Sequence, residues 1–194
     1  TLTLEITAQV TFESSNLPIV IINTDGQDIP NNYKITADMG IIYNGLGVRN
    51  YVTDSLNNYS GKIGIELRGS SSQMFPKKQY AVETRDEFGE NRNVSLLGLP
   101  QENDWILYAP YSDKSLMRNV LLYHLSNKIG QYASRSRYCE LILNGDYRGV
   151  YILFEKIKRD NNRVNISRLD SSDVSGDALT GGYIIKIDKK DGEE

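Results

Sequence analysis

Apolar and polar positions alternate along much of the first half of the chain, and this pattern predicts strands. The run KIGIELR (62–68) places Ile63, Ile65 and Leu67 on one face, because successive side chains of a strand point to opposite sides. We expect that face to line the core. Further runs rich in β-branched and aromatic residues, each bounded by turn formers, predict strands at 17–24, 33–44, 79–84 and 104–110.

The helical pattern lies at 112–131, SDKSLMRNVLLYHLSNKIGQ. Ser112 or Asp113 is suited to cap its first turn, and Gly130 is placed to end it in a left-handed conformation. Its apolar stripe predicts packing on a sheet, and consists of Leu116, Met117, Val120, Leu121, Leu125 and Ile129. The only histidine, His124, falls in this helix, where a packed or half-exposed structural role is expected rather than catalysis.

A β-hairpin is predicted after the helix, because Asn-Gly at 144–145 separates the strand-like runs 138–143 and 149–157. A polar connector then leads to a last predicted strand, YIIKID (183–188). The order of elements predicts an α+β fold: one antiparallel or mixed sheet carrying one main packed helix. Residues 1–194 are expected to form a single domain, with room for a short leading strand segment in 1–13.

Composition limits the partners. The chain has 22 basic and 25 acidic residues, and its net charge of −3 gives no global field that would attract nucleic acid. No stretch approaches the ~20 apolar residues of a membrane-spanning helix. The single cysteine, Cys139, lies in an apolar run and is expected to be a small buried side chain. Because the net charge gives no overall attraction for anions, any anion-binding site must consist of a local group of cations and N–H donors.

The stretch RGSSSQMFPKKQY (68–80) is more polar than a turn between two strands requires. Its backbone N–H groups, three hydroxyls and three cations suit a phosphate group. We predict that the phosphate is held by Arg68, Gly69, Ser70, Ser71, Ser72, Lys77 and Lys78. Alternation would send Lys77 and Lys78 to opposite faces, so only one of them is expected to enter a site. The alternative is a solvated polar loop with surface lysines.

Motifs of other chemistries are absent from the sequence. It contains no GxxxxGK[ST] loop, no GxGxxG and no GxSxG elbow. One histidine and one cysteine cannot supply the ligands of a usual zinc site, so no metal ligand is assigned. The carboxylate pairs at 86–87 and at 188 and 191 are expected to be solvated charges.

Five blocks of the sequence resemble the spore coat protein H (CotH) kinase family, in the family's order. They are SSNLPIVIINTDG (14–26), IELRGSSSQMFPKKQYAVET (65–84), LLGLPQENDWILYAPYSDKSLMRNVLLYHLSNKIGQY (96–132), ELILNGDYRGVYILFEKIKRDNNRVNI (140–166) and LTGGYIIKID (179–188). The resemblance implies an atypical protein kinase that transfers the γ-phosphoryl group of ATP to protein hydroxyls, with Mg²⁺, in a remodelled kinase-like fold.

The resemblance also implies roles for individual residues. The loop from Arg68 to Ser72, with Lys77 or Lys78, would hold the phosphates of ATP, and Glu155 would contact the nucleotide. Arg118 and Asn119 would lie on the counterpart of the kinase regulatory helix. This helix contains no glutamate, so the usual lysine–glutamate pair of kinases cannot form in its usual place.

Family members continue well beyond these blocks, and their catalytic and metal-binding loops lie in that later part. The resemblance therefore implies that residues 1–194 are the N-terminal lobe of a longer protein, with no catalytic residue of their own and weak ATP binding alone. Its partners would be a C-terminal lobe and an unidentified protein substrate, in an extracellular or cell-envelope setting. The alternative is a secreted or surface structural module that uses some of its 13 tyrosines to bind polysaccharide or a coat protein.

Overall fold

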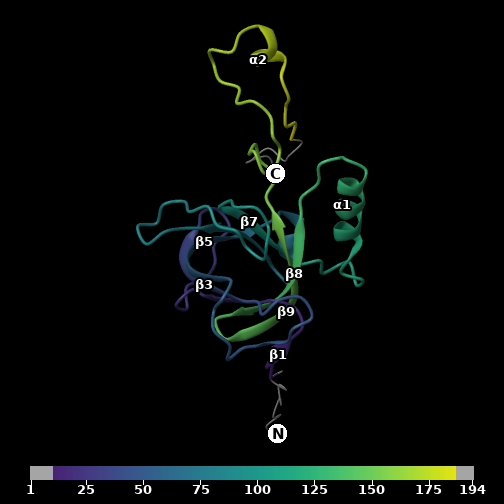
Figure 1. Cartoon of the computed structure of the whole chain (residues 1–194). Helices are drawn as coiled ribbons and strands as arrows, with labels where there is room; N and C mark the ends of the chain where they lie inside the picture. Colours follow the sequence, from purple (N-terminus) through teal and green to yellow (C-terminus); the bar gives the residue numbers. More distant parts are fainter. Residues whose placement is uncertain (1–10, 187–194) are drawn as a thin grey trace.

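The computed structural model describes residues 11–186, and its main feature is a closed barrel of seven strands (Figure 1). The strands follow the order β2-β3-β5-β6-β7-β9-β8 around the barrel. Every neighbouring pair is antiparallel except β2 and β8, which are parallel. Their bounds are β2 Ile19–Asn23, β3 Ile35–Ile42, β5 Tyr59–Arg68, β6 Gln79–Thr84, β7 Asp104–Tyr108, β8 Ser136–Leu143 and β9 Asp146–Glu155.

The remaining elements are short. A separate two-stranded sheet pairs β1, Ser14–Ser15, with β4, Asn50–Tyr51. A 3₁₀ helix, η1, spans Ser71–Met74; the main helix, α1, spans Arg118–Lys128; and α2 spans Gly176–Thr180. The predicted mixed sheet with one main helix is confirmed, and its closure into a barrel is an addition to that prediction.

The barrel interior is the core, and strand alternation fills it. Ile63 and Ile65 are fully buried and Leu67 packs against them, as the pattern of β5 predicted. Trp105 of β7 and Leu141 of β8 are also fully buried in this cluster. Cys139 is buried as predicted, and burial raises the pKa of its thiol to about 12.

The predicted Asn-Gly hairpin joins β8 to β9. Asn144 and Gly145 have φ angles of 51° and 81°, the left-handed values that this tight turn requires. The Asn144 side chain has a second role. Its Oδ1 accepts the backbone N–H of Thr24 at 2.8 Å, and its Nδ2 donates to the Thr24 hydroxyl at 2.9 Å. The hairpin is therefore tied to the end of β2.

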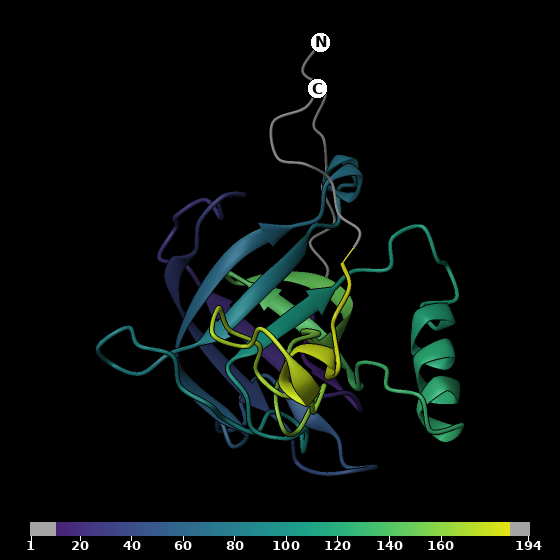
Figure 2. The same cartoon turned by 90° about the horizontal axis from the view of Figure 1, so that it is seen from above.

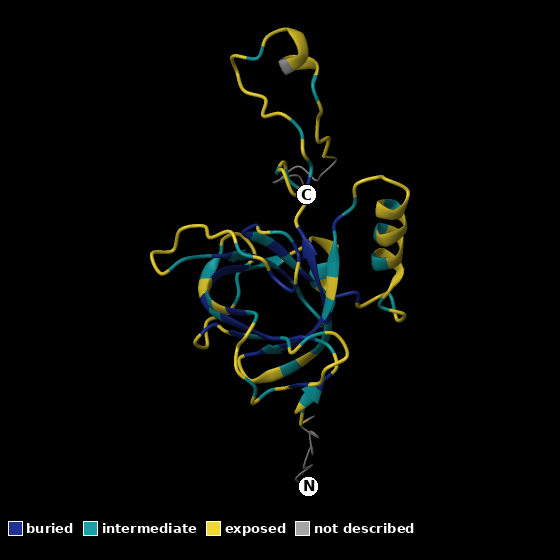
Figure 3. Cartoon of the chain, in the orientation of Figure 1, coloured by how far each residue is buried: buried dark blue, intermediate teal, exposed yellow. Residues whose placement is uncertain are grey.

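The predicted packing of the 112–131 helix on the sheet is wrong. α1 begins only at Arg118, because Leu116 adopts φ 58° and the segment from Asp113 to Leu116 forms a turn instead. No residue of α1 is buried, and Leu122 is 63% exposed. Figures 2 and 3 show α1 standing beside the barrel with most of its surface exposed. His124 is exposed as well, rather than packed.

The two ends of the chain also differ from prediction. Residues 183–186 form no strand, and 187–188 lie outside the described residues. The segment before them carries α2 and extends away from the barrel (Figure 1). Of the suggested leading strand in 1–13, residues 1–10 lie outside the described part, residues 11–13 are not in a strand, and β1 begins at Ser14.

The difference in burial between the barrel core and α1 can be tested by comparing the stability of two leucine-to-alanine variants. Leu141→Ala removes a fully buried side chain and should lower the free energy of unfolding by about 2–5 kcal/mol. Leu122→Ala makes the same chemical change on the exposed surface of α1 and should change it by less than about 0.5 kcal/mol. Urea unfolding followed by circular dichroism measures both. A comparable loss for Leu122→Ala would mean that the helix is packed.

Candidate functional site

The loop between β5 and β6 is held by the backbone conformation at Gly69 and by hydrogen bonds of the Gln73 side chain. Gly69 has φ +106°, and a Cβ at this position would lie 2.0 Å from the Ser72 hydroxyl, so only glycine fits. The Gln73 side-chain amide donates to the Gly69 carbonyl and to Asn31. Ser70 and Ser71 are exposed and Ser72 is partly buried, and none of the three is among the described residues that line the hollows below.

A first hollow, the side hollow, lies against the outer faces of β7 and β9 and has a volume of ≈ 600 Å³. Its lining comes from both strands, α1, the end of β5 and the chain after β9: Arg68, Ile106, Tyr108, Asn119, Tyr123, Ser134, Phe154, Glu155, Lys156, Ile157, Ile184, Ile185 and Lys186. It therefore combines apolar and aromatic walls with several cations. Of the predicted phosphate and nucleotide residues, it contains Arg68 and Glu155.

Aromatic contacts join α1 to the barrel at the side hollow. The Phe154 ring lies edge-on to the rings of Tyr108 and Tyr123, with centroid separations of 5.7 and 5.4 Å. Asn119 Nδ2 donates to the Tyr108 hydroxyl oxygen at 3.1 Å. Burial is the main cause that raises the pKa of Tyr108, which therefore stays a neutral phenol at physiological pH. These contacts set the position of the first turn of α1.

A second hollow, the mouth hollow, opens at one end of the barrel and has a volume of ≈ 580 Å³. Its lining is Gln27, Asp28, Ile29, Leu67, Pro76, Lys77, Lys78, Tyr80, Tyr111, Leu143, Asn144, Tyr147, Arg148 and Tyr151. Both predicted lysines are here. The alternation of a strand does not apply to residues 77–78, because β6 begins only at Gln79. The Lys77 ammonium donates to the Val150 carbonyl, and the Lys78 ammonium donates to the Gln73 carbonyl.

The predicted site residues thus divide between two hollows. Arg68 and Glu155 line the side hollow, and Lys77 and Lys78 line the mouth hollow. Sequence reasoning missed Arg148 and Tyr151 of the mouth hollow, and Tyr108 and Phe154 of the side hollow. The sequence pattern gave little indication of these residues. Tyr108 and Phe154 lie near the ends of their strands, where the sequence does not distinguish an aromatic residue that faces outward from one that packs in the core.

Glu155 has a structural partner that the sequence did not reveal. Its side chain is fully buried, and its carboxylate accepts from Arg135 Nε at 2.8 Å and Nη2 at 2.7 Å. The backbone N–H of Arg135 donates to the same carboxylate at 3.0 Å. Because the carboxylate oxygens are engaged in this way, a ligand in the side hollow would meet the backbone of Glu155 rather than its charge.

The chain that follows β9 is anchored to the barrel by buried charges. The Lys158 ammonium contacts the carboxylates of Glu102 and Asp104. Arg163 Nη1 donates to the Lys156 carbonyl at 2.7 Å, and its guanidinium lies 5.2 Å from the Trp105 ring centroid. The ion pairs and hydrogen bonds with Lys158 and Lys156 hold the pKa of the Asp104 carboxyl below its usual value, although burial opposes this. These contacts fix one wall of the side hollow.

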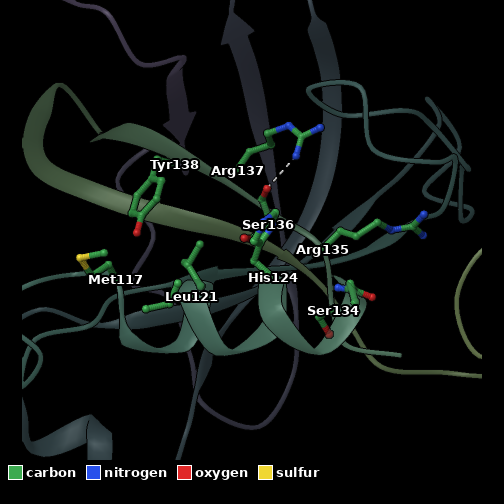
Figure 4. Close-up of a pocket in the computed structure, with 10 residues that line it drawn as sticks. Met117, Leu121, His124, Ser134, Arg135, Ser136, Arg137 and Tyr138 are labelled. Atoms are coloured by element: carbon green, nitrogen blue, oxygen red, sulfur yellow. Dashed lines mark hydrogen bonds between the residues drawn. The ribbon is translucent and has the colours of Figure 1, made fainter. Parts of the chain in front are cut away.

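A third hollow is the groove between α1 and β8, with a volume of ≈ 500 Å³ (Figure 4). Leu121 and His124 reach from α1 towards Ser136 and Tyr138 of β8. The Tyr138 hydroxyl donates to the Leu116 carbonyl at 2.9 Å and so fastens the turn before α1. The lining mixes apolar residues with Arg135 and Arg137; Arg135 is paired with Glu155, and Arg137 donates to the carbonyls of Leu97 and Ser136.

Neither a metal cluster nor a membrane helix is found within residues 11–186. No three or more His, Cys, Asp and Glu side chains are grouped there so that they could hold a metal ion. None of the helices in this part of the chain is long and apolar enough to cross a membrane.

Comparison with known protein families identifies the family of this chain. Residues 65–194 match the family described as "CotH kinase protein". This region begins within β5 and includes all residues that line the side hollow and all but Gln27, Asp28 and Ile29 of the mouth hollow. No curated protein matches the chain.

The pair between Glu155 and Arg135 predicts a loss of stability on neutralisation. Glu155→Gln should lower the free energy of unfolding by about 2–3 kcal/mol, because the Arg135 guanidinium, itself partly exposed, loses the charge of its buried carboxylate partner. Asp146→Asn is the control, since its pair with Arg148 is solvent-exposed and should matter by less than about 0.5 kcal/mol. If urea unfolding gives the same loss of unfolding free energy for Glu155→Gln as for Asp146→Asn, the pair of Glu155 with Arg135 stabilises the fold no more than an exposed ion pair does.

Proposed function

Since the chain belongs to the CotH kinase family, we propose that it is the nucleotide-binding lobe of an atypical protein kinase. The reaction is transfer of the γ-phosphoryl group of ATP to hydroxyl side chains of a protein. Phosphoryl transfer depends mostly on positioning and on neutralising charge, so the contribution of this lobe is to hold the nucleotide.

The composition of the side hollow is the observation that carries the proposal. Adenine is flat and largely apolar on its faces, and Ile106, Tyr108 and Phe154 offer apolar surface to it. The triphosphate is strongly anionic, and Arg68 lies at the end of β5 on the same hollow. Planar guanidinium groups bind phosphate oxygens through paired, charge-assisted hydrogen bonds.

The start of α1 supports the same placement. Asp113 accepts hydrogen bonds from the Ser115 hydroxyl and from the backbone N–H groups of Arg118 and Ser115, and these contacts lower the pKa of its carboxyl. This turn presents Arg118 and Asn119 together at the first residues of the helix. Asn119 already lines the side hollow. The helix start therefore adds polar groups near the proposed phosphates, without the glutamate of ordinary kinases.

Mg²⁺ would supply charge neutralisation between the phosphates of ATP. Residues 11–186 offer no carboxylate cluster to bind this ion, so on this proposal it arrives with the nucleotide. Metal ligands and the acceptor site would come from a second lobe. Arg68, rather than Lys77 or Lys78, becomes the main phosphate contact, because the lysines face the other hollow.

The test is an NMR titration of the ¹⁵N-labelled chain with ATP and Mg²⁺, in which amide shifts give the dissociation constant. Arg68→Ala should weaken binding about tenfold or more, the loss expected for a charge-assisted contact of about 1.5–3 kcal/mol. Phe154→Leu should also weaken it, because the aromatic wall of the side hollow is lost.

Two sets of controls accompany this titration. Arg92→Ala changes an exposed arginine that lines neither hollow, and should keep affinity within twofold. Lys77→Gln and Lys78→Gln should likewise leave ATP affinity unchanged. If both lysine variants lose ATP binding while Arg68→Ala keeps it, the nucleotide lies in the mouth hollow and the proposed placement is wrong.

A further inference from the structure

The mouth hollow has a charge pattern that the proposed nucleotide site does not use. Lys77, Lys78 and Arg148 line it together, and Asp28 at its exposed rim is the one carboxylate among its lining residues. We propose that the mouth hollow binds a small phosphate monoester of the sugar phosphate class, independently of ATP. This proposal does not depend on the placement of the nucleotide.

The two lysines carry charge that is not neutralised within the described part of the chain. Lys77 Nζ donates to the Val150 carbonyl at 2.8 Å and lies 4.6 Å from the Tyr151 ring centroid. Lys78 Nζ donates to the Gln73 carbonyl. Both ammonium groups therefore meet neutral acceptors, and neither forms an ion pair with a described carboxylate. An anion in the hollow would supply the missing counter-charge.

The burial of Lys77 makes its position costly for a cation. Burial is the main cause that lowers the pKa of Lys77, and the more distant charge of Glu140 only partly opposes it. Glu140 cannot turn to meet the lysine freely, because its carboxylate accepts from the hydroxyls of Ser15 and Tyr147 at 2.9 and 2.8 Å. A phosphate dianion beside Lys77 would favour its ammonium form and so oppose the effect of burial on its pKa.

The backbone of β9 leaves room for the Lys77 side chain because residue 149 is a glycine. Gly149 has φ +80°, and a Cβ built there would lie 3.2 Å from the Lys77 ammonium nitrogen. The Tyr151 hydroxyl donates to the Lys78 carbonyl at 2.8 Å, which ties the lysine segment to β9. The lysines are thus held in place before a ligand arrives, which lowers the entropy cost of binding.

The rest of the lining suits a small polar body attached to the phosphate. Tyr80 and Tyr111 offer amphipathic ring surface, and Asn144 and Asp28 offer hydrogen-bonding groups to hydroxyls. The volume of ≈ 580 Å³ lies within the ~300–1,000 Å³ range of small-molecule sites. This mixture favours a sugar phosphate over a bare phosphate ion, which would leave the tyrosine and amide groups unused.

The experiment titrates the ¹⁵N-labelled chain with glucose 6-phosphate, inorganic phosphate and glucose. Glucose 6-phosphate should shift the amides of Lys77, Lys78 and Arg148, and should bind at least about fivefold more tightly than inorganic phosphate. Glucose should bind far more weakly than its phosphate. The proposal is overturned if glucose 6-phosphate fails to bind at millimolar concentration, or binds no better than inorganic phosphate or than glucose.

Variants separate this site from the nucleotide site. Lys77→Gln and Lys78→Gln should each weaken glucose 6-phosphate about tenfold, while Lys62→Gln, an exposed lysine paired with Asp38, should stay within twofold. Arg68→Ala should leave glucose 6-phosphate binding intact. Circular dichroism checks that each variant is folded. Full affinity in both Lys77→Gln and Lys78→Gln would refute the site even if ATP binds as proposed.

Discussion

The parallel pairing of β2 with β8 is the constraint on which the rest of the molecule depends. Residues Ile19–Ile22 pair with Glu140–Leu143, so the first barrel strand meets a strand that follows it by about 120 residues. This contact turns a curved sheet into a closed barrel and removes both of its free edges. The bond between Asn144 and Thr24 fastens the end of the same seam.

Closure decides where ligands can bind. Because the interior is filled by large side chains such as Trp105 and Leu141, space remains only on the outer face and at the barrel mouth. The β5–β6 loop borders both places, which is why its cations divide: Arg68 lies on the side hollow and Lys77 and Lys78 on the mouth hollow. One basic loop thereby serves two separate hollows.

Local patterns were enough to predict most of the barrel strands and the hairpin, because alternation in β5 and the Asn-Gly turn act within a few residues, but the strand predicted from 183 does not form over residues 183–186. Closure could not be read from the sequence, since it depends on pairing between segments far apart in the chain. A helix was correctly predicted within 112–131, but it begins only at Arg118 and its apolar stripe does not cover a sheet. The contacts of α1 with the barrel include the Tyr123–Phe154 ring contact and the hydrogen bond from Asn119 to Tyr108. The ion pair of Glu155 with Arg135 could not be predicted from the sequence either, because the two residues lie twenty positions apart and meet only in the folded barrel.

The central claim is that the nucleotide lies on the outer face of the closed barrel and not at its mouth. Paramagnetic relaxation with Mn²⁺ and ATP tests this most directly, because Mn²⁺ bound to the phosphates broadens nearby amide signals. The account predicts strong broadening at Arg68, Asn119 and Ile157, with signals of the mouth residues Lys77, Lys78 and Arg148 retained. Broadening centred on those mouth residues, with the outer face unaffected, would contradict it.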